Sequence, residues 1–543
     1  MEKRKILSNR TFLYLTEFFS GMSVMAVELG ANRLLAPYFS SSQIVWTIII
    51  GTIMIAMALG NVYGGRAADK NPDPDRLYRR ILIAAIWIAA IPLFGKYVIL
   101  GISALLIVTI STNLLIWAAL FSCLVIFVFP LFLLGTVTPS LIKFTVDSLE
   151  ESGSIAGRLG AANTIGSIIG TFLPTFVRIP AVGTSVTFLI FSGVLLVLCL
   201  LYFTSGRKKN PAKATAIAAA FAVLCAFGHS SSFAFWEKDL TYEGESVYNY
   251  LQVREDDQTV NLSTNVLFGV QSVYEKNSRL TGMYYDYAMA APLMEGAASS
   301  DSGGSADILI LGNGTGTYAT QCERYFDGMN IEGVEIDGKI MDLARKYFDE
   351  PKDVKVTEYD GRAFLNAIDK KYDVIMVDAY RDITIPFQMS TVEFFTGVRD
   401  HLNEGGVMVV NMNMRGESES GQDRADINTY LADTIASVFN QVWTADVPET
   451  TNRELFAANR PAGGDTLASS LASSLPSITK SDLRSLMETV SGSLTAYEAG
   501  THIMTDDRAP VEMLGIRQLD SIIRDEAGYY KEQILNGNFS LET

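Results

Sequence analysis

A glycine-rich turn in the second half of the chain follows a short apolar run. The run Ile308–Leu311 leads into Gly312, Gly314 and Gly316, and a helical pattern comes next. Glycine allows the backbone to turn tightly and to approach a ligand closely. This order of strand, turn and helix predicts one side of a nucleotide-binding crevice.

Each of the next three predicted strands ends at or near an acidic residue. These are Ile331–Ile336 with Glu335 and Asp337, Val354–Thr357 followed by Asp360 and Gly361, and Tyr372–Val377 followed by Asp378. Ligands of parallel sheets bind at the carboxyl ends of the strands, so we expect these acids to converge with the glycine turn on one crevice. The alternative is that each carboxylate only caps the loop beside it.

The acidic strand ends favour one class of nucleotide over another. Carboxylates accept hydrogen bonds from ribose hydroxyls and attract a positive sulfonium, whereas they repel a pyrophosphate. The phosphate-binding pattern GxxxxGK[ST] is absent from the sequence. We therefore expect an S-adenosyl ligand rather than NAD.

No metal is expected, because the three histidines are far apart and the four cysteines show no paired spacing.

The chain divides into two parts of different composition. Up to Lys213 it has 18 Lys and Arg against 9 Asp and Glu, whereas the totals for the 543 residues are 43 and 59, which gives a net charge of −16. The first part is thus apolar and basic, and the second is acidic. This split excludes a single soluble domain, and the acidic balance argues against a nucleic-acid partner.

Long apolar runs recur from Thr11 to about His229. A helix that spans a bilayer needs about 20 apolar residues. The sequence predicts six spans, at 11–31, 44–64, 80–100, 114–136, 159–177 and 184–203, with a weaker seventh at 213–230. The stretch 97–112 fits the end of the third span, an interfacial helix or a short span of its own. The lipid bilayer is therefore an expected partner.

Basic clusters predict which ends of the spans lie in the cytoplasm. The clusters Lys3–Arg10, Arg66–Arg80 and Arg207–Lys213 place the N-terminus, the loop after the second span and the end of the sixth span there. We expect a multi-pass protein of the cell inner membrane. We expect its acidic part in the cytoplasm, where S-adenosyl donors are made, although the hydropathy of 213–230 favours a seventh crossing.

Three further patterns predict local structure. The run Gly64–Asp69 resembles the cytoplasmic loop of major-facilitator transporters, and six spans are half of such a transporter. The apolar part is therefore expected to be an anchor or to form a homodimer.

Small-residue runs at 153–157 and 160–170 suit close helix packing. Gly, Ser and Ala patches within 413–480, notably Ala462–Ser474, predict a loop or linker.

In the order of its motifs, the acidic part resembles the spermidine synthases, a family of polyamine aminopropyltransferases. The matching motifs are Glu245–Tyr248, Val266–Ser272, Tyr284–Asp286, Leu311–Thr317, Val334–Asp337, Asp360–Gly361, Tyr372–Asp378, Ile385–Phe387, Glu393–Phe395, Gly405–Val407 and Thr505–Glu512. With the apolar part included, the whole chain resembles the membrane-fused, major-facilitator-like form of these proteins in bacteria.

The resemblance implies a multi-domain fold. An α-helical transmembrane bundle at 1–230 would precede a small β-rich region at 231–300. A Rossmann-like α/β domain of the S-adenosylmethionine-dependent transferase type would follow at 301–543. The donor would be S-adenosylmethionine in its decarboxylated form, the acceptor a small amine, and methylthioadenosine would be released without a metal.

The resemblance also implies roles for individual residues. Asp378 would accept the proton of the amine, with Tyr284 and Asp382 assisting. Glu335 would hold the ribose of the donor and Asp360 would face the adenine. The other implied donor-binding positions are Gly312, Gly314, Thr315, Gly316, Asp337, Gly361, Asn249 and Asp286.

Several positions depart from the family pattern. Thr315 stands in place of an acid, Asn249 in place of Gln and Tyr285 in place of His, and Arg381 or Asp382 occupies the place of the family's second Asp after the fourth strand. These departures leave open an enzyme that cleaves, cyclises or transfers methyl from intact S-adenosylmethionine, and also a non-enzymatic sensor or transporter of polyamines or nucleosides. The motif Asp506–Arg508 either covers the site or forms an ion pair.

Overall fold

The computed structural model describes residues 9–535, except 111–112, 147–150, 206–210, 231, 238–239, 267–268, 278–279, 297–304, 381–384, 414–425 and 462. Contacts divide the chain into two compact units. One is helical and comprises 1–237 together with 243–250 and 265–267, and the other comprises the remaining residues and is an α/β unit.

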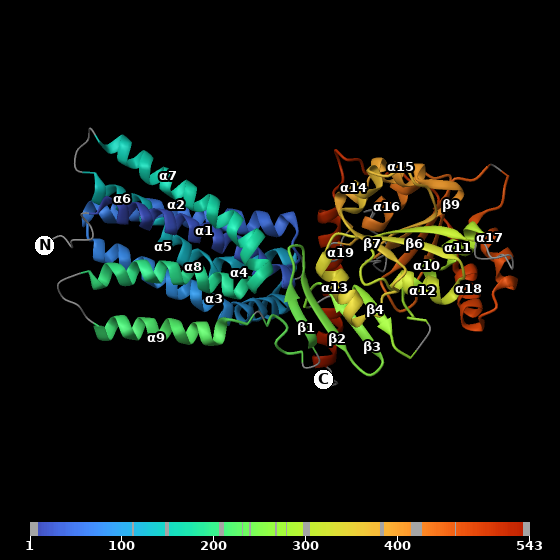
Figure 1. Cartoon of the computed structure of the whole chain (residues 1–543), viewed down its shortest axis with the longest axis horizontal. Helices are drawn as coiled ribbons and strands as arrows, with labels where there is room; N and C mark the ends of the chain where they lie inside the picture. The colour runs from blue at the N-terminus through green and yellow to red at the C-terminus, as the bar shows by residue number, and fades with distance from the viewer. Residues whose placement is uncertain are drawn as a thin grey trace. The chain divides into compact units, whose positions relative to one another are not determined.

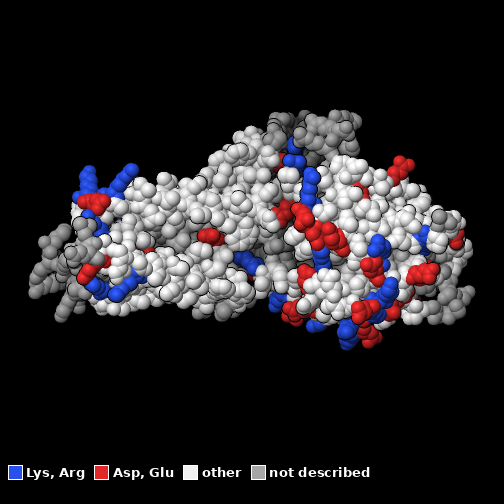
Figure 2. Space-filling view, turned by 90° about the horizontal axis from the view of Figure 1, so that it is seen from above, with Lys and Arg blue, Asp and Glu red and all other residues white. Residues whose placement is uncertain are grey.

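The helical unit consists of long apolar helices, drawn in blue to green in Figure 1. They are α1(Arg10–Phe39), α2(Gln43–Lys70), α3(Pro74–Thr109), α4(Leu114–Ile126), α5(Val128–Gly135), α6(Val137–Thr145), α7(Ser152–Leu173), a π-helical turn (Pro174–Arg178), α8(Ile179–Thr204) and α9(Pro211–Gly228). On the face drawn in Figure 2 this unit is mostly uncharged; most of its blue and red side chains gather at one end, and a red and a blue patch lie farther along it.

Among the described residues, five helices are long and apolar enough to cross a membrane, where the sequence predicted six. They are Arg10–Phe39, Gln43–Lys70, Pro74–Ile107, Val128–Thr145 and Val182–Thr204. The predicted span 114–136 covers α4 and α5, which meet at Phe127, and its bounds are wrong, because the helix that is long and apolar enough to span is Val128–Thr145. The stretch 97–109 continues α3 and is no separate span. The predicted span 159–177 covers the second part of α7 and most of the π-helical turn after it, and α7 is not among the five helices, because its many Gly, Ser and Ala residues leave it less apolar.

Two glycines of α7 bring that helix against α1. A Cβ atom on Gly166 would lie 2.0 Å from the Phe18 carbonyl oxygen, and one on Gly170 would lie 2.1 Å from the Met22 carbonyl oxygen. Only glycine permits backbones to approach this closely. The predicted close packing is thus confirmed for the second small-residue run. The first run, at 153–157, has open space beside Gly153 and Gly157.

A polar cluster inside the helical unit also joins three helices. Glu17 of α1 is buried, and its Oε1 accepts hydrogen bonds from the Thr138 hydroxyl of α6 at 2.5 Å and from the Asn163 amide of α7 at 2.8 Å. Hydrogen bonds between helices stabilise their association where the surroundings are apolar. This cluster therefore helps to fix which helices pack together.

The α/β unit contains an eight-stranded sheet with the order β12-β10-β11-β9-β8-β5-β6-β7. Its strands are β5(Ala306–Leu311), β6(Met329–Glu335), β7(Lys355–Glu358), β8(Tyr372–Val377), β9(Leu402–Met412), β10(Gln441–Asp446), β11(Arg453–Ala458) and β12(Thr495–Ala496). Strands β5 to β9 are parallel, and β10, β11 and β12 pair antiparallel. The predicted Rossmann-like fold and the four predicted strands β5 to β8 are confirmed.

Helices cover both faces of this sheet (Figure 1). The helices are α10(Tyr284–Ala288), α11(Ala290–Glu295), α12(Thr317–Tyr325), α13(Gly338–Tyr347), α14(Gly361–Asn366), α15(Val392–Asp400), α16(Ile427–Ala436), α17(Leu467–Ser474), α18(Ser481–Ser493) and α19(Val511–Leu535), with 3-10 turns at Phe387–Met389 and Leu475–Ser477. The main core lies between the sheet and the group α10, α11, α12, α17 and α18.

A second, four-stranded sheet has the order β1-β2-β3-β4, with β1(Leu240–Glu245), β2(Tyr250–Glu255), β3(Thr259–Ser263) and β4(Ser272–Glu275). Apolar side chains of β2 and β3 pack against Ile340, Leu343 and Phe348 of the α13 region. The sequence predicted a β-rich region at this position.

The prediction of loop or linker for the Gly, Ser and Ala patches within 413–480 is wrong for Ala462–Ser474, and residues 414–425 of that stretch lie outside the described residues. The described part contains α16, β10, β11 and α17, and Ala462–Ser474 ends in a regular helix whose N-cap is Thr466. The small residues there are tolerated because Leu467 and Leu471 are buried against the core. Tertiary burial therefore decides the conformation that the local composition left weak.

Candidate active site

The glycine turn brings the ends of β5 and β8 together. Gly312 has a φ of +91°, and a Cβ atom there would lie 2.5 Å from the Asp378 carbonyl oxygen. The Asp378 amide donates to the Leu311 carbonyl at 2.9 Å. Strand order reverses between β5 and β8, which is where a doubly wound sheet opens a crevice. Asp378 thus stands at the expected place for ligand binding.

Asp378 is held from two sides by donors. Its Oδ2 accepts a hydrogen bond from the Tyr284 hydroxyl of α10 at 2.6 Å, and its Oδ1 accepts one from the Asn411 amide of β9 at 3.0 Å. Burial raises the pKa of Asp378 to about 7, and the two hydrogen bonds offset this only in part. A carboxylate with a pKa near neutrality is suited to proton transfer at the pH of a cell.

Two tyrosines extend the surroundings of Asp378. The Tyr285 ring lies 3.9 Å from the Tyr284 ring between centroids, and its hydroxyl donates to the Gln271 carbonyl at 2.6 Å. The Tyr380 hydroxyl donates to the backbone carbonyl of Asn411 at 2.6 Å and accepts from the backbone amide of Asn413 at 3.0 Å. Both hydroxyls are therefore occupied by backbone groups, which fixes the rings around the acid.

Glu335 meets the glycine turn from the end of β6. Its Oε2 accepts from the Gly314 amide at 2.9 Å and its Oε1 from the Asp337 amide at 3.0 Å. Burial raises the pKa of Glu335 to about 7, against the opposing effect of these hydrogen bonds. The structure thus brings Glu335, Gly314 and the Gly312–Asp378 contact to one edge of the sheet, as predicted.

Asp337 and Asp360 both cap helices. Asp337 accepts from the Lys339 amide at 3.0 Å at the start of α13, and Asp360 accepts from the Ala363 amide at 2.8 Å at the start of α14. This is the capping alternative that the sequence left open. Gly361 begins α14, and a Cβ atom there would lie 3.2 Å from the Met389 side chain.

Four predicted site residues lie away from this cluster or outside the described residues. Asp286 of α10 is buried and accepts from the Gly282 backbone amide and the Gln321 side chain, which ties α10 to the segment before it and to α12. The buried Thr315 hydroxyl lies 3.4 Å from that of Thr317. The remaining two are Asn249, which belongs to the helical unit, and Asp382, which lies with Arg381 outside the described residues.

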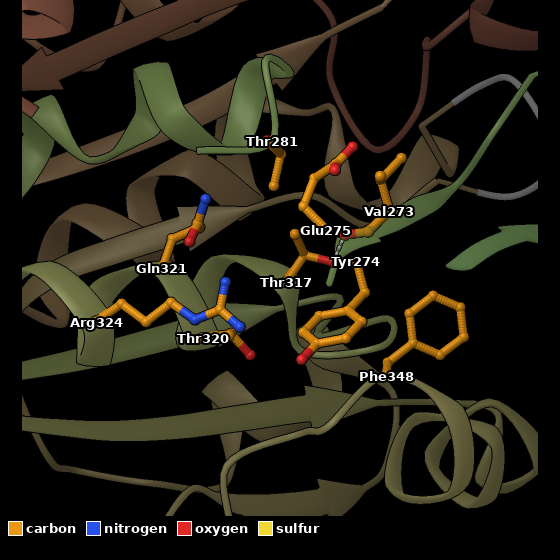
Figure 3. A pocket seen from close by; sticks show the side chains of 9 residues that line it. All are labelled: Val273, Tyr274, Glu275, Thr281, Thr317, Thr320, Gln321, Arg324 and Phe348. Carbon is orange, nitrogen blue, oxygen red and sulfur yellow. Dashed lines mark hydrogen bonds between the residues drawn. The ribbon is translucent and has the colours of Figure 1, made fainter. Parts of the chain in front are cut away.

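Near Asp286, a small pocket lies where β4 meets α12 (Figure 3). Its lining includes Val273 and Tyr274 of β4 and Thr317, Gln321 and Arg324 of α12. Neither Asp378 nor Glu335 belongs to its lining. Gly316, which has a φ of +79°, directly precedes α12. The hydroxyl of the next residue, Thr317, donates to the Val273 carbonyl at 3.1 Å.

Sequence reasoning missed two polar residues beside Asp378. Asn411 of β9 donates to Asp378, and Glu454 of β11 is paired with Asn411 in the antiparallel ladder. Both lie on strands whose register no local pattern fixes. The apolar run Leu455–Ala458 was the available signal for β11, and the sequence analysis made no strand prediction from it.

Among the described residues there is no group of three or more His, Cys, Asp and Glu side chains that could hold a metal ion.

Comparison with known proteins assigns the chain to a family. Residues 291–448 match the model of the spermine/spermidine synthase domain. The chain is 51% identical over 353 residues to a probable polyamine aminopropyl transferase of Bifidobacterium longum, which covers 63% of this chain and 76% of the relative. The chain belongs to the spermine/spermidine synthase family. It is therefore a transferase, and the non-enzymatic alternative is set aside.

More distant relatives match a shorter part of this synthase-family chain. The polyamine aminopropyltransferase of Hydrogenobaculum sp. is 27% identical over 195 residues, which is 35% of this chain and 63% of the relative. The crystal structure of a probable spermidine synthase from Corynebacterium glutamicum is 19% identical, with a TM-score of 0.35 over 48% of this chain and 96% of that one.

Proposed function

We propose that this protein is a membrane-anchored aminopropyltransferase that uses decarboxylated S-adenosylmethionine and a small amine and releases methylthioadenosine. The observation that supports this most directly is Asp378, a buried carboxyl with a pKa of about 7 that Tyr284 and Asn411 hold at the switch point of the sheet. The similarity over 76% of a probable polyamine aminopropyl transferase supports the same reaction class.

The donor would lie along the edge formed by the glycine turn and Glu335. Gly314 has a φ of +55°, and a Cβ atom built on it would have one neighbour within 4 Å, the Ser272 hydroxyl at 3.1 Å. A side chain at this position would therefore fill space beside the turn that the donor is proposed to use. Glu335 would accept hydrogen bonds from the ribose hydroxyls. Asp360 uses one oxygen as a helix cap, and its other oxygen would face the adenine amino group.

The reaction proposed here is a single displacement. The lone pair of the amine nitrogen forms a bond to the aminopropyl carbon that is attached to sulfur. The carbon–sulfur bond breaks, and its electron pair stays on sulfur, which becomes the neutral thioether of methylthioadenosine. The new ammonium then loses one proton to a base. Because the leaving group is neutral, the protein needs to align the reactants and to take up this proton.

Asp378 is the proposed acceptor of that proton. Its pKa of about 7 leaves a substantial fraction ionised at neutral pH, and its position between two donors fixes the orientation of the carboxylate. Tyr284 would position Asp378 rather than act as a base, because burial raises the pKa of its phenol well above the ordinary value. Asp382 stays a proposed assistant from the sequence alone.

The helical unit is proposed to anchor the enzyme in the inner membrane. Five helices have the necessary length and hydropathy, and large apolar side chains such as Met54, Phe176 and Phe227 are exposed on the unit. Exposed apolar surface of this kind suits lipid. We propose that the α/β unit lies in the cytoplasm, where its donor is made, and we keep 1–230, 231–300 and 301–543 as the domain bounds.

A second candidate function keeps the fold and changes the donor. Thr315 stands where the family pattern has an acid, and its side chain is buried, with its hydroxyl 3.4 Å from that of Thr317. A site with one negative charge fewer tolerates the carboxylate of intact S-adenosylmethionine better. Cleavage, cyclisation or methyl transfer from the intact donor is therefore the second candidate.

One experiment separates the two candidates. The purified full-length protein is incubated with intact or decarboxylated S-adenosylmethionine, with and without putrescine, and the products are identified by mass spectrometry. We expect methylthioadenosine and an extended polyamine only when the decarboxylated donor and the amine are both present. Methylthioadenosine or a methylated product from the intact donor would replace the first proposal with the second.

A further inference from the structure

Glu454 of β11 is a fully buried acid to which no part of the proposed reaction gives a role. Its side chain is 0% exposed, and among the described residues neither carboxyl oxygen has a hydrogen-bond partner. No ion pair joins it to a Lys or Arg among those residues. Buried polar groups are nearly always hydrogen-bonded, so two unpartnered oxygens on one buried acid require an explanation.

The sheet places Glu454 in a row with the proposed catalytic acid. Glu454 is directly opposite Asn411 in the β9–β11 ladder, and directly opposite residues of an antiparallel pair share a face. Asn411 in turn donates to Asp378. Asn452 is two residues before Glu454 and therefore lies on the same face. Its side-chain amide donates to the Asn411 side-chain oxygen at 2.9 Å. Asp378, Asn411 and Glu454 thus follow one another across β8, β9 and β11.

This row lies on the face that α10 covers, where Tyr284 and Tyr285 are found. The ionisable groups that interact electrostatically with Glu454 are Asp378, Tyr285, Tyr318 and Tyr380, and all of them are acids. Burial together with the charge of Asp378 raises the pKa of Glu454 well above its ordinary value. The three tyrosines are neutral at neutral pH, so Asp378 is the neighbour that can add negative charge, and none of the four supplies a cation.

We propose that Glu454 binds a cationic nitrogen of the amine acceptor, so that Asp378 faces the attacking nitrogen and Glu454 faces the second nitrogen of a short diamine. Two strand spacings separate Asp378 from Glu454, or about 10 Å between backbones, and both side chains extend from the same face, so a short diamine is of the right size. Glu454 is then the residue that selects diamines over monoamines. This inference rests on the proposed function, because it assigns the acceptor of the same reaction.

The test compares three forms of the full-length protein, wild type, Glu454→Gln and the control Glu332→Gln. Glu332 lies in the same sheet but pairs with Lys370 and Tyr372 at 3.3 and 2.7 Å, away from Asp378. Binding of putrescine is measured by calorimetry in the presence of methylthioadenosine. The KM and kcat for putrescine and for its monoamine analogue butylamine are measured with the decarboxylated donor.

We expect Glu454→Gln to weaken putrescine binding and to raise its KM by about 10- to 100-fold, the usual effect of losing a hydrogen bond to a charged group. The KM for the donor and the reaction with butylamine should stay within about twofold of wild type, and Glu332→Gln should behave like wild type. Gln has the shape of Glu without the charge, so the thermal stability of the variant should be equal or higher.

A second variant makes the inference independent of one substitution. Glu454→Asp keeps the charge but withdraws it by one carbon, so it should shift the preference from putrescine toward the longer diamine cadaverine. The inference is overturned if putrescine binds Glu454→Gln as tightly as wild type, if wild type binds no diamine, or if both amines are affected equally together with a loss of stability. Binding that depends on Glu454 without any transfer would instead reject the proposed function and retain this site.

Discussion

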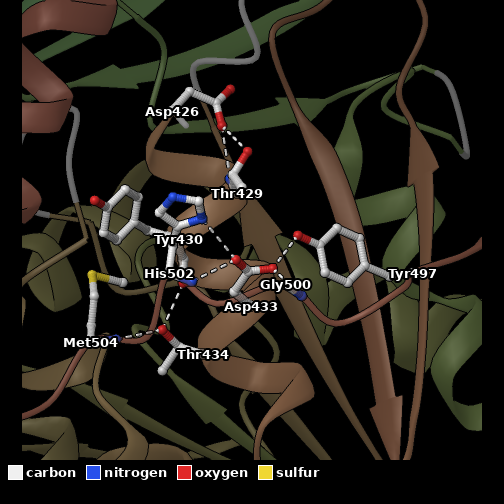
Figure 4. A network of polar contacts seen from close by, with 9 residues as sticks. All are labelled: Asp426, Thr429, Tyr430, Asp433, Thr434, Tyr497, Gly500, His502 and Met504. Carbon is white, nitrogen blue, oxygen red and sulfur yellow. Dashed lines mark hydrogen bonds and ion pairs between the residues drawn. The ribbon is translucent and has the colours of Figure 1, made fainter. Parts of the chain in front are cut away.

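Asp433 and Asp378 are both acids of the α/β unit, but their hydrogen bonds differ. Asp433 of α16 accepts hydrogen bonds from the Tyr497 hydroxyl at 2.7 Å, the Gly500 amide at 2.8 Å and the His502 amide at 2.9 Å, and the His502 ring lies at 3.2 Å (Figure 4). Asp378 accepts only two, and Glu454 beside it accepts none among the described residues.

The pKa values of the two acids differ in the same way. Burial tends to raise the pKa of Asp433, but the hydrogen bonds from Tyr497, His502 and Gly500 outweigh it and hold the pKa below its ordinary value. Burial prevails at Asp378 and raises its pKa to about 7. Asp433 is thus satisfied by its own chain, whereas Asp378 and Glu454, the acids with proposed roles in the reaction, are less fully hydrogen-bonded, as expected of groups that bind a substrate.

Replacement of Asp378 should have the largest effect on activity. Asp378→Asn removes the proposed proton acceptor while leaving its shape, so we expect kcat to fall by about 10³-fold, within the range of general-base catalysis. Turnover is measured by methylthioadenosine release. The matched control is Asp433→Asn, which should keep the turnover of the folded fraction. Equal loss in both variants would erase the distinction between the two acids.

The same substitution should change how stability depends on pH. Because the pKa of Asp378 in the folded chain is about 7 against an ordinary value of 3.8, the folded state retains a proton that the unfolded state has lost between these pH values. Stability from this group is therefore fully present below about pH 4 and is lost as the pH rises through about 7. Asp378→Asn should flatten the pH dependence in this window, as followed by denaturant unfolding from pH 5 to 8.

Substitution of Gly312 should lower activity without touching any functional group. In Gly312→Ala the new Cβ would meet the Asp378 carbonyl oxygen at 2.5 Å, and the positive φ of +91° adds strain. A displacement of Asp378 by about 1 Å is expected to lower kcat by about 10²-fold. Gly405→Ala is a suitable control, because Gly405 also has a positive φ, of +84°, but open space around it. Similar rates for both variants would show that the close approach is unimportant.

Asp433→Asn should act mainly on stability. The amide cannot accept all the hydrogen bonds that Tyr497, Gly500 and His502 donate to the carboxylate, so buried donors are left unsatisfied. We expect a loss of about 2 kcal/mol in the free energy of unfolding, measured by denaturant titration. Asp426→Asn on the same helix is the comparison, because Asn is as good an N-cap as Asp and that change should cost little.

The sequence predicted the parts of the site that local patterns determine. The strands β5 to β8, the glycine turn and the acids Glu335 and Asp378 follow from short runs in which apolar residues, glycine and acid succeed one another. Their convergence follows from the topology of parallel sheets. The pairing of Tyr284 with Asp378 was implied only by resemblance, because the two residues are far apart in the chain.

What the sequence could not predict depends on antiparallel register and on burial. Asn411 and Glu454 come together because β11 returns beside β9, and no local pattern fixes that register. Glu454 lies among apolar residues of β11 such as Phe456 and Ala458, which belong to the main core, so its burial follows from the place of the strand in the sheet.

Tyr284→Phe should have a moderate effect that identifies Tyr284 as a positioning residue. The hydrogen bond from its hydroxyl lowers the pKa of Asp378, so its loss should raise that pKa above about 7. We expect kcat at pH 7 to fall by about tenfold and the pH–rate profile to shift to higher pH, with recovery at pH 9. Tyr285→Phe, whose hydroxyl donates to the Gln271 carbonyl, should leave the profile in place. If the pH–rate profile of Tyr284→Phe is not shifted, Tyr284 does not influence the pKa of Asp378 and is not a positioning residue.

The ion pair between Arg362 and Asp506 should have the smallest effect. The guanidinium donates to both carboxylate oxygens, at 2.7 and 2.6 Å, and it lowers the pKa of Asp506, but the Asp506 side chain is 41% exposed. Exposed pairs contribute little, so Arg362→Ala should cost about 1 kcal/mol or less in unfolding free energy. Arg362 lies two residues after Asp360, which is proposed to face the adenine. The KM for the donor therefore distinguishes the two roles left open for Asp506–Arg508, a cover of the site or an ion pair. We expect that KM to stay within about twofold, whereas a tenfold rise would make the 505–508 segment a cover of the donor site.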